Sequence, residues 1–225
     1  MKPLRDCHLY AFVDSAYLHG RPPEEITRQL CDGGADLIQL RAKGGQVEDI
    51  QRVAGKLLPI CERAGVGLVI NDHPKLALQL GAPLCHLGQE DFFDAGFTCA
   101  EQITGCPKEL QLGLSTHSPE QAQHALRAAP DYIAIGPVFA TATKPGRAAV
   151  TLDYVRWAAA HVHIPWFAIG GITLDNLDEV LAAGATRICV VGAILNAPDL
   201  AEACGQFKNR LLSAPRKSSI VNPKS

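Results

Sequence analysis

A regular alternation of two kinds of segment limits the folds open to this chain more than any other feature of its 225 residues. Short apolar runs of strand type recur at 8–13, 36–41, 67–70, 84–87, 110–115, 132–136, 166–170 and 187–191. Between them lie stretches with apolar residues at helical spacing, as at 24–34, 47–65, 118–129, 152–161 and 174–184. The pattern predicts a strand followed by a helix, eight times over.

Strict alternation of strands and helices predicts a parallel sheet, because parallel neighbours are joined by crossover connections. Eight units of nearly uniform size favour a closed (β/α)8 TIM barrel over an open doubly wound sheet. Helix punctuation agrees, since Ser118-Pro119, Thr151 and Thr173 precede helical patterns and Gly65 follows one. We therefore predict the α/β class and a single barrel.

Residues 214–225 differ from the rest of the chain. They lose the helical period and gather Pro, Ser and Lys, which is typical of a flexible tail. Binding of a partner is the alternative. No linker-like stretch interrupts the interior, so we predict one catalytic domain over residues 1–213 followed by this tail.

Composition argues against several classes of function. Hydrophobic residues make up 47% of the chain and charged residues 20%, as in an ordinary folded core. The formal net charge of -2 creates no long-range field that would recruit nucleic acid or an anionic membrane. No apolar run approaches the ~20 residues that cross a bilayer. We predict a cytoplasmic protein whose anionic ligands meet a local cluster of cations; a homo-oligomer remains open.

Eight cysteines are scattered along the chain without a CxxC pair or a secretory leader. They are Cys7, Cys31, Cys61, Cys85, Cys99, Cys106, Cys189 and Cys204. We interpret them as reduced thiols, most of them small core residues, rather than as disulfides or zinc ligands.

Polar residues gather where the predicted strands end. In a (β/α)8 barrel the catalytic groups lie at these carboxyl ends, so these residues are the candidates for chemistry. Four successive strands are followed by such groups: Gln39, Arg41, Lys43, Asn71, Asp72, Gln89, Glu90, Asp91, Ser115, Thr116 and His117.

Asp72 and Asp91 follow neighbouring strands, which lie ~4.8 Å apart in a parallel sheet and could direct both carboxylates at one point. Mg²⁺ takes one or two protein carboxylates and completes its shell with water and substrate phosphate oxygens. The pair therefore predicts a Mg²⁺ site. The alternative makes Asp72 a cap of the next helix, ahead of Pro74, and Asp91 a solvated loop acid.

Three cations share the same predicted rim: Arg41 and Lys43 after the second strand, and Lys144 after the sixth. Arg can grip two phosphate oxygens with its planar fork, and Lys supplies a mobile point charge. Taken singly, each is more typical of a surface residue. Beside two acids, they predict a diphosphate site.

Glycines after the last two strands indicate a second anion site. Barrels commonly bind phosphate there through backbone N–H groups, and Gly170-Gly171 and Gly192 lie at these positions. Thr141 and Thr143 could add hydroxyl donors. A simple turn is the alternative for the glycine pair.

Two anion sites and a metal, without an obvious Ser/His/acid triad, indicate a transfer reaction. Diphosphate would leave and a second phosphorylated molecule would attack, without a covalent enzyme intermediate. His73, His86, His117 and His124 could be bases, but single histidines more often lie on helix surfaces or in packed cores. We keep only His117 as a candidate.

Seven segments match a known family, in its order along the chain. They are IQLRAK at 38–43, INDHPKLAL at 70–78, HLGQED at 86–91, GLSTH at 113–117, YIAIGPVFATATKPG at 132–146, AIGGI at 168–172 and VVGAI at 190–194. With these motifs the chain closely resembles the thiamine phosphate synthase family over about residues 8–200.

The resemblance implies that 4-amino-2-methyl-5-(diphosphooxymethyl)pyrimidine is joined to 4-methyl-5-(2-phosphoethyl)thiazole, giving thiamine phosphate and diphosphate. The residues it assigns to the pyrimidine diphosphate are Gln39, Arg41, Lys43, Asn71, Ser115 and Lys144. Those it assigns to the thiazole phosphate are Thr141, Thr143, Gly171, Val191 and Gly192. It makes Asp72 and Asp91 the ligands of the cofactor Mg²⁺.

The mechanism that the resemblance implies is dissociative. Diphosphate departs first, the aminopyrimidine stabilises the methyl cation, and the thiazole nitrogen then attacks. Mg²⁺, Arg41, Lys43 and Lys144 would stabilise charge growing on the leaving group. Ser115 would bond the pyrimidine and tune its electron donation, so these four residues carry the expected catalytic roles.

One departure from the family pattern bears on affinity. The family commonly has VVSAI where this chain has VVGAI, so Gly192 lacks a hydroxyl donor to phosphate but keeps its backbone N–H. Weaker binding of the thiazole is the expected consequence.

Three other functions stay open. A thiazole tautomerase of the same fold shares the phosphate site but is not expected to keep the paired acids and the pyrimidine clamp, which this chain has. A non-catalytic sensor would bind thiamine phosphates without turnover. A generic phosphate-binding lyase or isomerase would not bind the pyrimidine diphosphate.

Overall fold

The computed structural model describes residues 1–105, 108–140 and 149–214. Its strands close into one barrel in the order β1 to β8, and every neighbouring pair is parallel. They are β1 (Leu9–Asp14), β2 (Leu37–Arg41), β3 (Gly67–Asn71), β4 (Leu84–Gly88), β5 (Gln111–Thr116), β6 (Tyr132–Ile135), β7 (Trp166–Ile169) and β8 (Ile188–Cys189). The predicted (β/α)8 barrel is confirmed.

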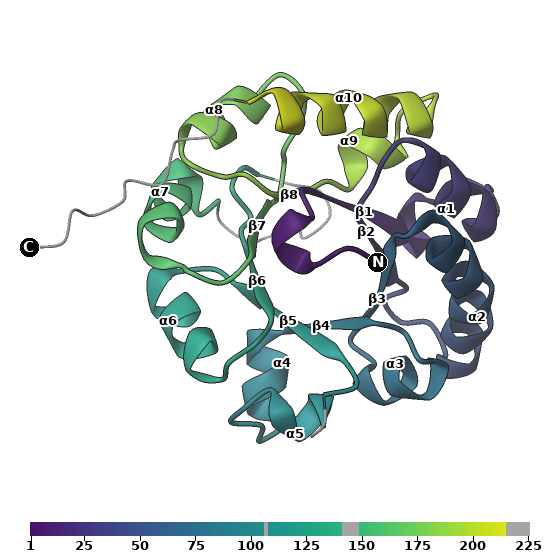
Figure 1. Cartoon of the computed structure of the whole chain (residues 1–225), viewed down its shortest axis with the longest axis horizontal. Coiled ribbons are helices and arrows are strands. Elements are labelled where there is room, and N and C mark those ends of the chain that lie inside the picture. The colour runs from purple at the N-terminus through teal and green to yellow at the C-terminus, as the bar shows by residue number, and fades with distance from the viewer. Residues whose placement is uncertain (106–107, 141–148, 215–225) are drawn as a thin grey trace, which may run out of the picture.

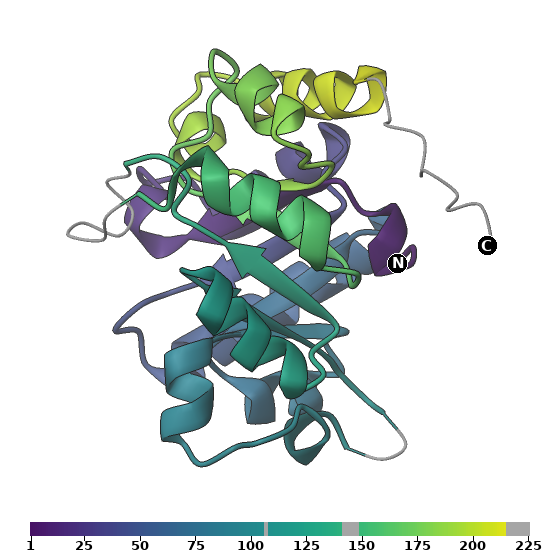
Figure 2. The ribbon, with the colours of Figure 1, turned by 90° about the vertical axis from the view of Figure 1, so that its left-hand side faces the viewer.

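Helices surround the strands on the outside of the barrel (Figures 1 and 2). The α-helices are α1 (Pro23–Asp32), α2 (Val47–Ala64), α3 (Pro74–Leu80), α4 (Gln89–Asp94), α5 (Glu101–Thr104), α6 (Pro119–Arg127), α7 (Thr151–His161), α8 (Leu177–Ala182), α9 (Gly192–Leu195) and α10 (Leu200–Ser213). Two 3-10 helices flank β1: η1 (Leu4–Asp6) and η2 (Ser15–Tyr17). No described helix is long and apolar enough to span a membrane. The predicted tail lies outside the described residues, apart from Ala214.

Two of the four predicted helix ends are confirmed, Thr151 lies one residue too late because Val150 is the N-cap of α7, and Thr173 is wrong. Ser118 caps α6 by accepting a hydrogen bond from the Gln121 N–H at 3.2 Å, and Gly65 ends α2 with a φ of 69°. Thr173 does not precede a helix directly, because α8 begins only at Leu177. The Asn176 Oδ1 instead accepts from the Thr173 N–H at 2.9 Å, which holds the intervening residues in a turn.

Strand register brings polar strand ends to one rim. Asp14 pairs with Arg41, Asn71 with His86, and Gly88 with Ser115. Asp14, Arg41, Asn71 and Gly88 are the last residues of their strands and Ser115 is the last but one of β5, so side chains far apart in sequence meet at the same end of the barrel.

Aromatic rings fill part of the barrel interior. Tyr10, Tyr132 and Phe167 contact one another edge to face, with ring centroids 5.5 to 6.1 Å apart. Gly113 on β5 makes room for this cluster, since a Cβ there would overlap the Tyr132 ring. The centre of the barrel is therefore packed.

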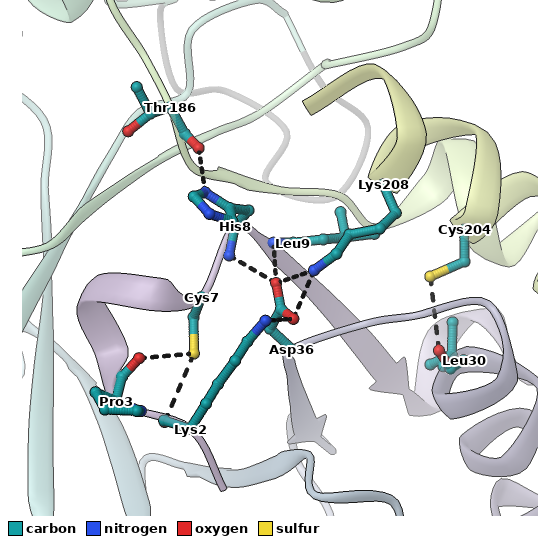
Figure 3. A network of polar contacts seen from close by, with 10 residues as sticks. All are labelled: Lys2, Pro3, Cys7, His8, Leu9, Leu30, Asp36, Thr186, Cys204 and Lys208. Atoms are coloured by element: carbon teal, nitrogen blue, oxygen red, sulfur yellow. Dashed lines mark hydrogen bonds and ion pairs between the residues drawn. The ribbon is translucent and has the colours of Figure 1, made fainter. Parts of the chain in front are cut away.

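The N-terminal segment covers the other end of the barrel, where η1 lies across the opening (Figure 1). A Cβ on Gly67, the first residue of β3, would collide with the Met1 Sδ. Next to this segment, Asp36 binds both Lys2 and Lys208 (Figure 3). The two ion pairs join the N-terminal segment to α10.

Candidate active site

A cavity of about 670 Å³ opens at the carboxyl ends of the strands. Ten of the residues predicted to form the site line it: Gln39, Arg41, Lys43, Asn71, Asp72, Asp91, Ser115, Gly171, Val191 and Gly192. The other three, Thr141, Thr143 and Lys144, lie outside the described residues. All described residues that were assigned to the two substrates and to the metal therefore share one cavity.

Asp72 follows the last residue of β3 and has a left-handed backbone with a φ of 63°. Its N–H donates to the His86 backbone oxygen at 2.9 Å, and its carboxylate accepts from the Asn71 Nδ2 at 2.6 Å. The cap alternative for Asp72 is wrong, because His73 is the N-cap of α3 and no side chain caps that helix. The strained backbone and the Asn71 amide instead orient an exposed carboxylate at the cavity.

Asp91 lies in the first turn of α4, directly after β4. Gly88 allows its position: a Cβ on Gly88 would lie 2.5 Å from the Asp91 Oδ2. Side-chain crowding would therefore displace this carboxylate if β4 ended in any other residue.

The two carboxylates suit a hard cation that takes only some of its ligands from the protein. Among the described residues no group of three or more His, Cys, Asp or Glu side chains could enclose a metal ion. Asp72 and Asp91 are both exposed on the cavity wall. This donor set fits Mg²⁺, which keeps waters and takes phosphate oxygens, and does not fit a structural zinc site.

Arg41, the last residue of β2, is held by an acid that the sequence analysis missed. Its Nη1 lies 2.5 Å from the Asp14 Oδ2, and the two side chains are 11% and 1% exposed. The other Asp14 oxygen accepts from the Ala16 N–H at 3.0 Å. Asp14 directly follows the first apolar run, so the rule applied to the other strand ends could have found it.

The glycines of the predicted phosphate site differ in how strictly the backbone requires them. Gly170 and Gly171 have φ values of 105° and 64°, and a Cβ on Gly171 would lie 2.6 Å from the Ala140 oxygen. At Gly192 a Cβ would make only ordinary contacts, the nearest being the Asn196 Nδ2 at 3.4 Å. The structure therefore explains the glycine pair but does not explain Gly192.

The histidines divide between the cavity and the surface. His117 lines the cavity, where its Nδ1 lies 2.5 Å from the Gly136 oxygen, whereas His124 stacks on Phe93 outside the barrel. His86, which the sequence left among surface or packed histidines, is buried but also lines the cavity. Its Nε2 lies 2.9 Å from the Ser115 Oγ.

Tyr10 and Tyr132 lie next to this pair and carried no sequence signal, because both sit inside apolar runs. The Tyr132 hydroxyl lies 3.1 Å from the His86 Nδ1 and 3.1 Å from the Tyr10 hydroxyl. Burial raises the pKa of both tyrosines well above the usual value, so both hydroxyls keep their protons near neutral pH. A buried polar cluster of side chains from four strands therefore borders the cavity, and three of its members, Tyr10, His86 and Ser115, line it.

Comparisons with known proteins point to one family. Residues 9–194 match the family described as thiamine monophosphate synthase. A thiamine-phosphate synthase of Acidothermus cellulolyticus is 45% identical over 213 residues, covering 94% of this chain and 98% of the relative. One from Thermus thermophilus is 44% identical over 192 residues, covering 82% and 87%.

A solved structure is similar over the same range. The thiamine phosphate pyrophosphorylase of Pyrococcus furiosus has a TM-score of 0.82 and 28% identity, covering 94% of this chain and 98% of that one. Sequence and structure thus give one assignment, and the chain belongs to the thiamine monophosphate synthase family.

Proposed function

We propose that this chain is a transferase that joins 4-amino-2-methyl-5-(diphosphooxymethyl)pyrimidine to 4-methyl-5-(2-phosphoethyl)thiazole, releasing diphosphate and forming thiamine phosphate. One observation carries the proposal: the described residues assigned to the two substrates and to the metal line a single cavity at the carboxyl ends of the strands. A transfer between two phosphorylated molecules needs both anion sites to open into one space.

The diphosphate would be held by the side of the cavity formed by β2 to β4. Asp14 already binds the Nη1 of Arg41, which fixes the plane of the guanidinium. The other N–H groups of Arg41 can donate to phosphate oxygens. Lys43 is exposed on the same wall and would add a mobile charge. Together they would stabilise negative charge as the carbon–oxygen bond to diphosphate breaks.

Asp72 and Asp91 would hold Mg²⁺, with water and diphosphate oxygens completing its shell. When bound, the ion would neutralise part of the charge on the leaving group. Asn71 would orient the Asp72 carboxylate, to which its amide already donates, and contact the pyrimidine diphosphate.

The thiazole phosphate would lie against Gly171, Val191 and Gly192 on the opposite wall, where backbone N–H groups can donate to it. Thr141, Thr143 and Lys144 remain predicted contacts. A cytoplasmic location, the lack of nucleic acid and membrane partners, and a possible homo-oligomer also remain predictions.

Formation of thiamine phosphate from the two purified substrates tests the proposal. We expect product and diphosphate only when both substrates are present, loss of turnover after chelation of divalent ions, and recovery on adding Mg²⁺. Turnover that a chelator leaves unchanged would contradict the metal assignment. Tight binding of thiamine phosphate without turnover would indicate the sensor, and failure to bind the pyrimidine diphosphate in calorimetry would indicate another phosphate-binding barrel enzyme.

A further inference from the structure

A continuous run of hydrogen bonds crosses the inside of the barrel from β2 to β5. We call it the Gln39–Ser115 relay; it consists of Gln39, Tyr10, Tyr132, His86 and Ser115. In that order the successive contacts are 2.5 Å, 3.1 Å, 3.1 Å and 2.9 Å long. All five side chains are buried, and both ends of the relay reach the cavity wall.

Packing does not require the relay's two hydroxyl groups. The Tyr10 ring stacks on Phe12 at 5.3 Å and meets Phe167 edge to face at 5.5 Å, so phenylalanines already serve in the same aromatic cluster. A buried hydroxyl is costly unless it is hydrogen-bonded, and here each tyrosine oxygen has two partners. The oxygens of Tyr10 and Tyr132 therefore serve the polar contacts.

The direction of the relay follows from its first contact. The Gln39 Nε2 can only donate, so the Tyr10 oxygen accepts from it. Within the described part of the chain, the Tyr132 oxygen is the one other partner of the Tyr10 hydroxyl, and so it receives the Tyr10 proton. The Tyr132 proton must then point to the His86 Nδ1, because the reverse order would leave a buried O–H without an acceptor.

This direction selects one tautomer of His86. Since the Nδ1 accepts from Tyr132, the imidazole carries its proton on Nε2 and donates it to the Ser115 Oγ. The Ser115 oxygen therefore already accepts a hydrogen bond, and its own proton is directed elsewhere. Ser115 lines the cavity, so the cavity is where this proton can find an acceptor.

We propose that Tyr10, Tyr132 and His86 are positioning residues that turn the Ser115 hydroxyl into a hydrogen-bond donor toward the pyrimidine substrate. This inference rests on the proposed function. The atom that Ser115 binds would be an acceptor, such as an unprotonated ring nitrogen, and an N–H at that place would meet another donor. Such a site rejects ligands that lack the acceptor, because a buried O–H would be left unpaired.

Nitrogen NMR of the His86 ring tests the relay directly. Long-range proton–nitrogen spectra distinguish a protonated from an unprotonated ring nitrogen, and the His86→Gln variant identifies the signal. We expect protonated Nε2 in the unmodified protein. In Tyr132→Phe, which removes the donor to Nδ1, we expect a population protonated on Nδ1. Tyr10→Phe should change the tautomer less, because Tyr132 can still donate to His86.

Kinetics supply the second measurement. We expect Tyr132→Phe to raise KM for the pyrimidine diphosphate about tenfold, the effect of one weakened hydrogen bond, and to leave KM for the thiazole phosphate nearly unchanged. Tyr154→Phe is the matched control: Tyr154 is also buried, and its hydroxyl bonds Thr116 at 2.7 Å outside the relay. It should alter neither the His86 tautomer nor the pyrimidine KM.

Two results would overturn the relay. One is His86 protonated on Nδ1 in the unmodified, active enzyme. The other is a folded Tyr132→Phe variant whose tautomer and pyrimidine KM match those of Tyr154→Phe. Failure of the proposed function is separate, since it would appear as absence of thiamine phosphate formation whatever the tautomer of His86.

Discussion

Asp14 and Asp36 are both buried acids beside β1 and β2, but they lie at opposite ends of the barrel. Asp36 precedes β2 and contacts Lys2 and Lys208 at 2.5 Å each (Figure 3). It also accepts from the backbone N–H groups of His8 and Leu9 at 2.6 and 2.9 Å. Asp14 ends β1 and, among the residues that the structure describes, contacts one cation, Arg41, together with one backbone N–H.

The difference shows how one kind of ion pair can serve two purposes. At the amino end, the bonds of Asp36 tie the N-terminal segment and α10 to the sheet, so the network contributes to stability. At the carboxyl end, Arg41 also lines the cavity, so Asp14 orients a cation whose remaining donors can meet a ligand. Barrels commonly divide stability and catalysis between their two ends in this way.

The largest expected effect is on activity at the carboxyl end. Asp72→Asn should lower kcat about 10³-fold, because it removes a charge near the leaving group. The fold should tolerate it, since Asp72 is exposed and Asn accepts a left-handed backbone. Steady-state kinetics against Mg²⁺ concentration measure the effect. Asp94→Asn, an exposed acid of α4 outside the cavity, is the control; an Asp72→Asn enzyme as active as this control would break the assignment.

The largest effect at the amino end should be on stability. Asp36→Ala leaves Lys208, which is 14% exposed, without its carboxylate, and should lower the free energy of unfolding by about 3 kcal/mol. Urea unfolding measures the change, and kcat of the folded enzyme should not change. Asp178→Ala breaks the exposed pair with Arg210 and should cost much less. Equal losses in the two variants would refute the role given to Asp36.

Asp14→Asn tests the other half of the comparison. It should lower kcat/KM about 10²-fold by releasing Arg41 from its position, and should destabilise the protein less than Asp36→Ala, because Arg41 can reach water in the cavity. Kinetics and urea unfolding on the same preparation separate the two effects. A variant that loses stability but keeps kcat/KM would show that Asp14, like Asp36, contributes to stability and not to activity.

Low pH should reduce the stability that the Asp36 ion pairs contribute at the amino end of the barrel. Burial acts to raise the pKa of Asp36, but hydrogen bonds from Lys2, Lys208 and two backbone N–H groups outweigh it and keep that pKa below its usual value of 3.8. A lowered folded-state pKa stabilises the protein above the unfolded value, and this stability is lost as pH falls through the folded value. As the pH falls from 6 to about 3, the free energy of unfolding should therefore decline more steeply in the unmodified protein than in Asp36→Ala. Parallel curves would contradict this linkage.

The smallest effect should be a gain in affinity. A Cβ fits at Gly192, so Gly192→Ser can add a hydroxyl donor without moving the backbone. We expect KM for the thiazole phosphate to fall about fivefold, the effect of one added hydrogen bond, with stability nearly unchanged. Gly192→Ala, which adds the carbon without the hydroxyl, is the control. An equal fall in both variants would assign the effect to packing.

Local sequence patterns predicted the fold and many of the residues that line the cavity. The residues after the second to fifth strands could be assigned to one mouth because parallel strands all end at the same side of a barrel. Asp72, Asp91 and Arg41 needed no knowledge of contacts for this assignment. How Gly88 admits the Asp91 carboxylate could not be predicted, since it depends on the path of the chain into α4.

By itself, the sequence determined the (β/α)8 barrel, the end of the barrel where the candidate site residues gather, and the family. Each of these depends on periodicity or on short motifs, which are local properties of the chain. Only the tertiary structure decided which buried polar groups meet. Tyr10 and Tyr132 are 122 residues apart, and Asp36 and Lys208 are 172 apart. Such contacts arise because the sheet closes in one register, and no local pattern encodes that register.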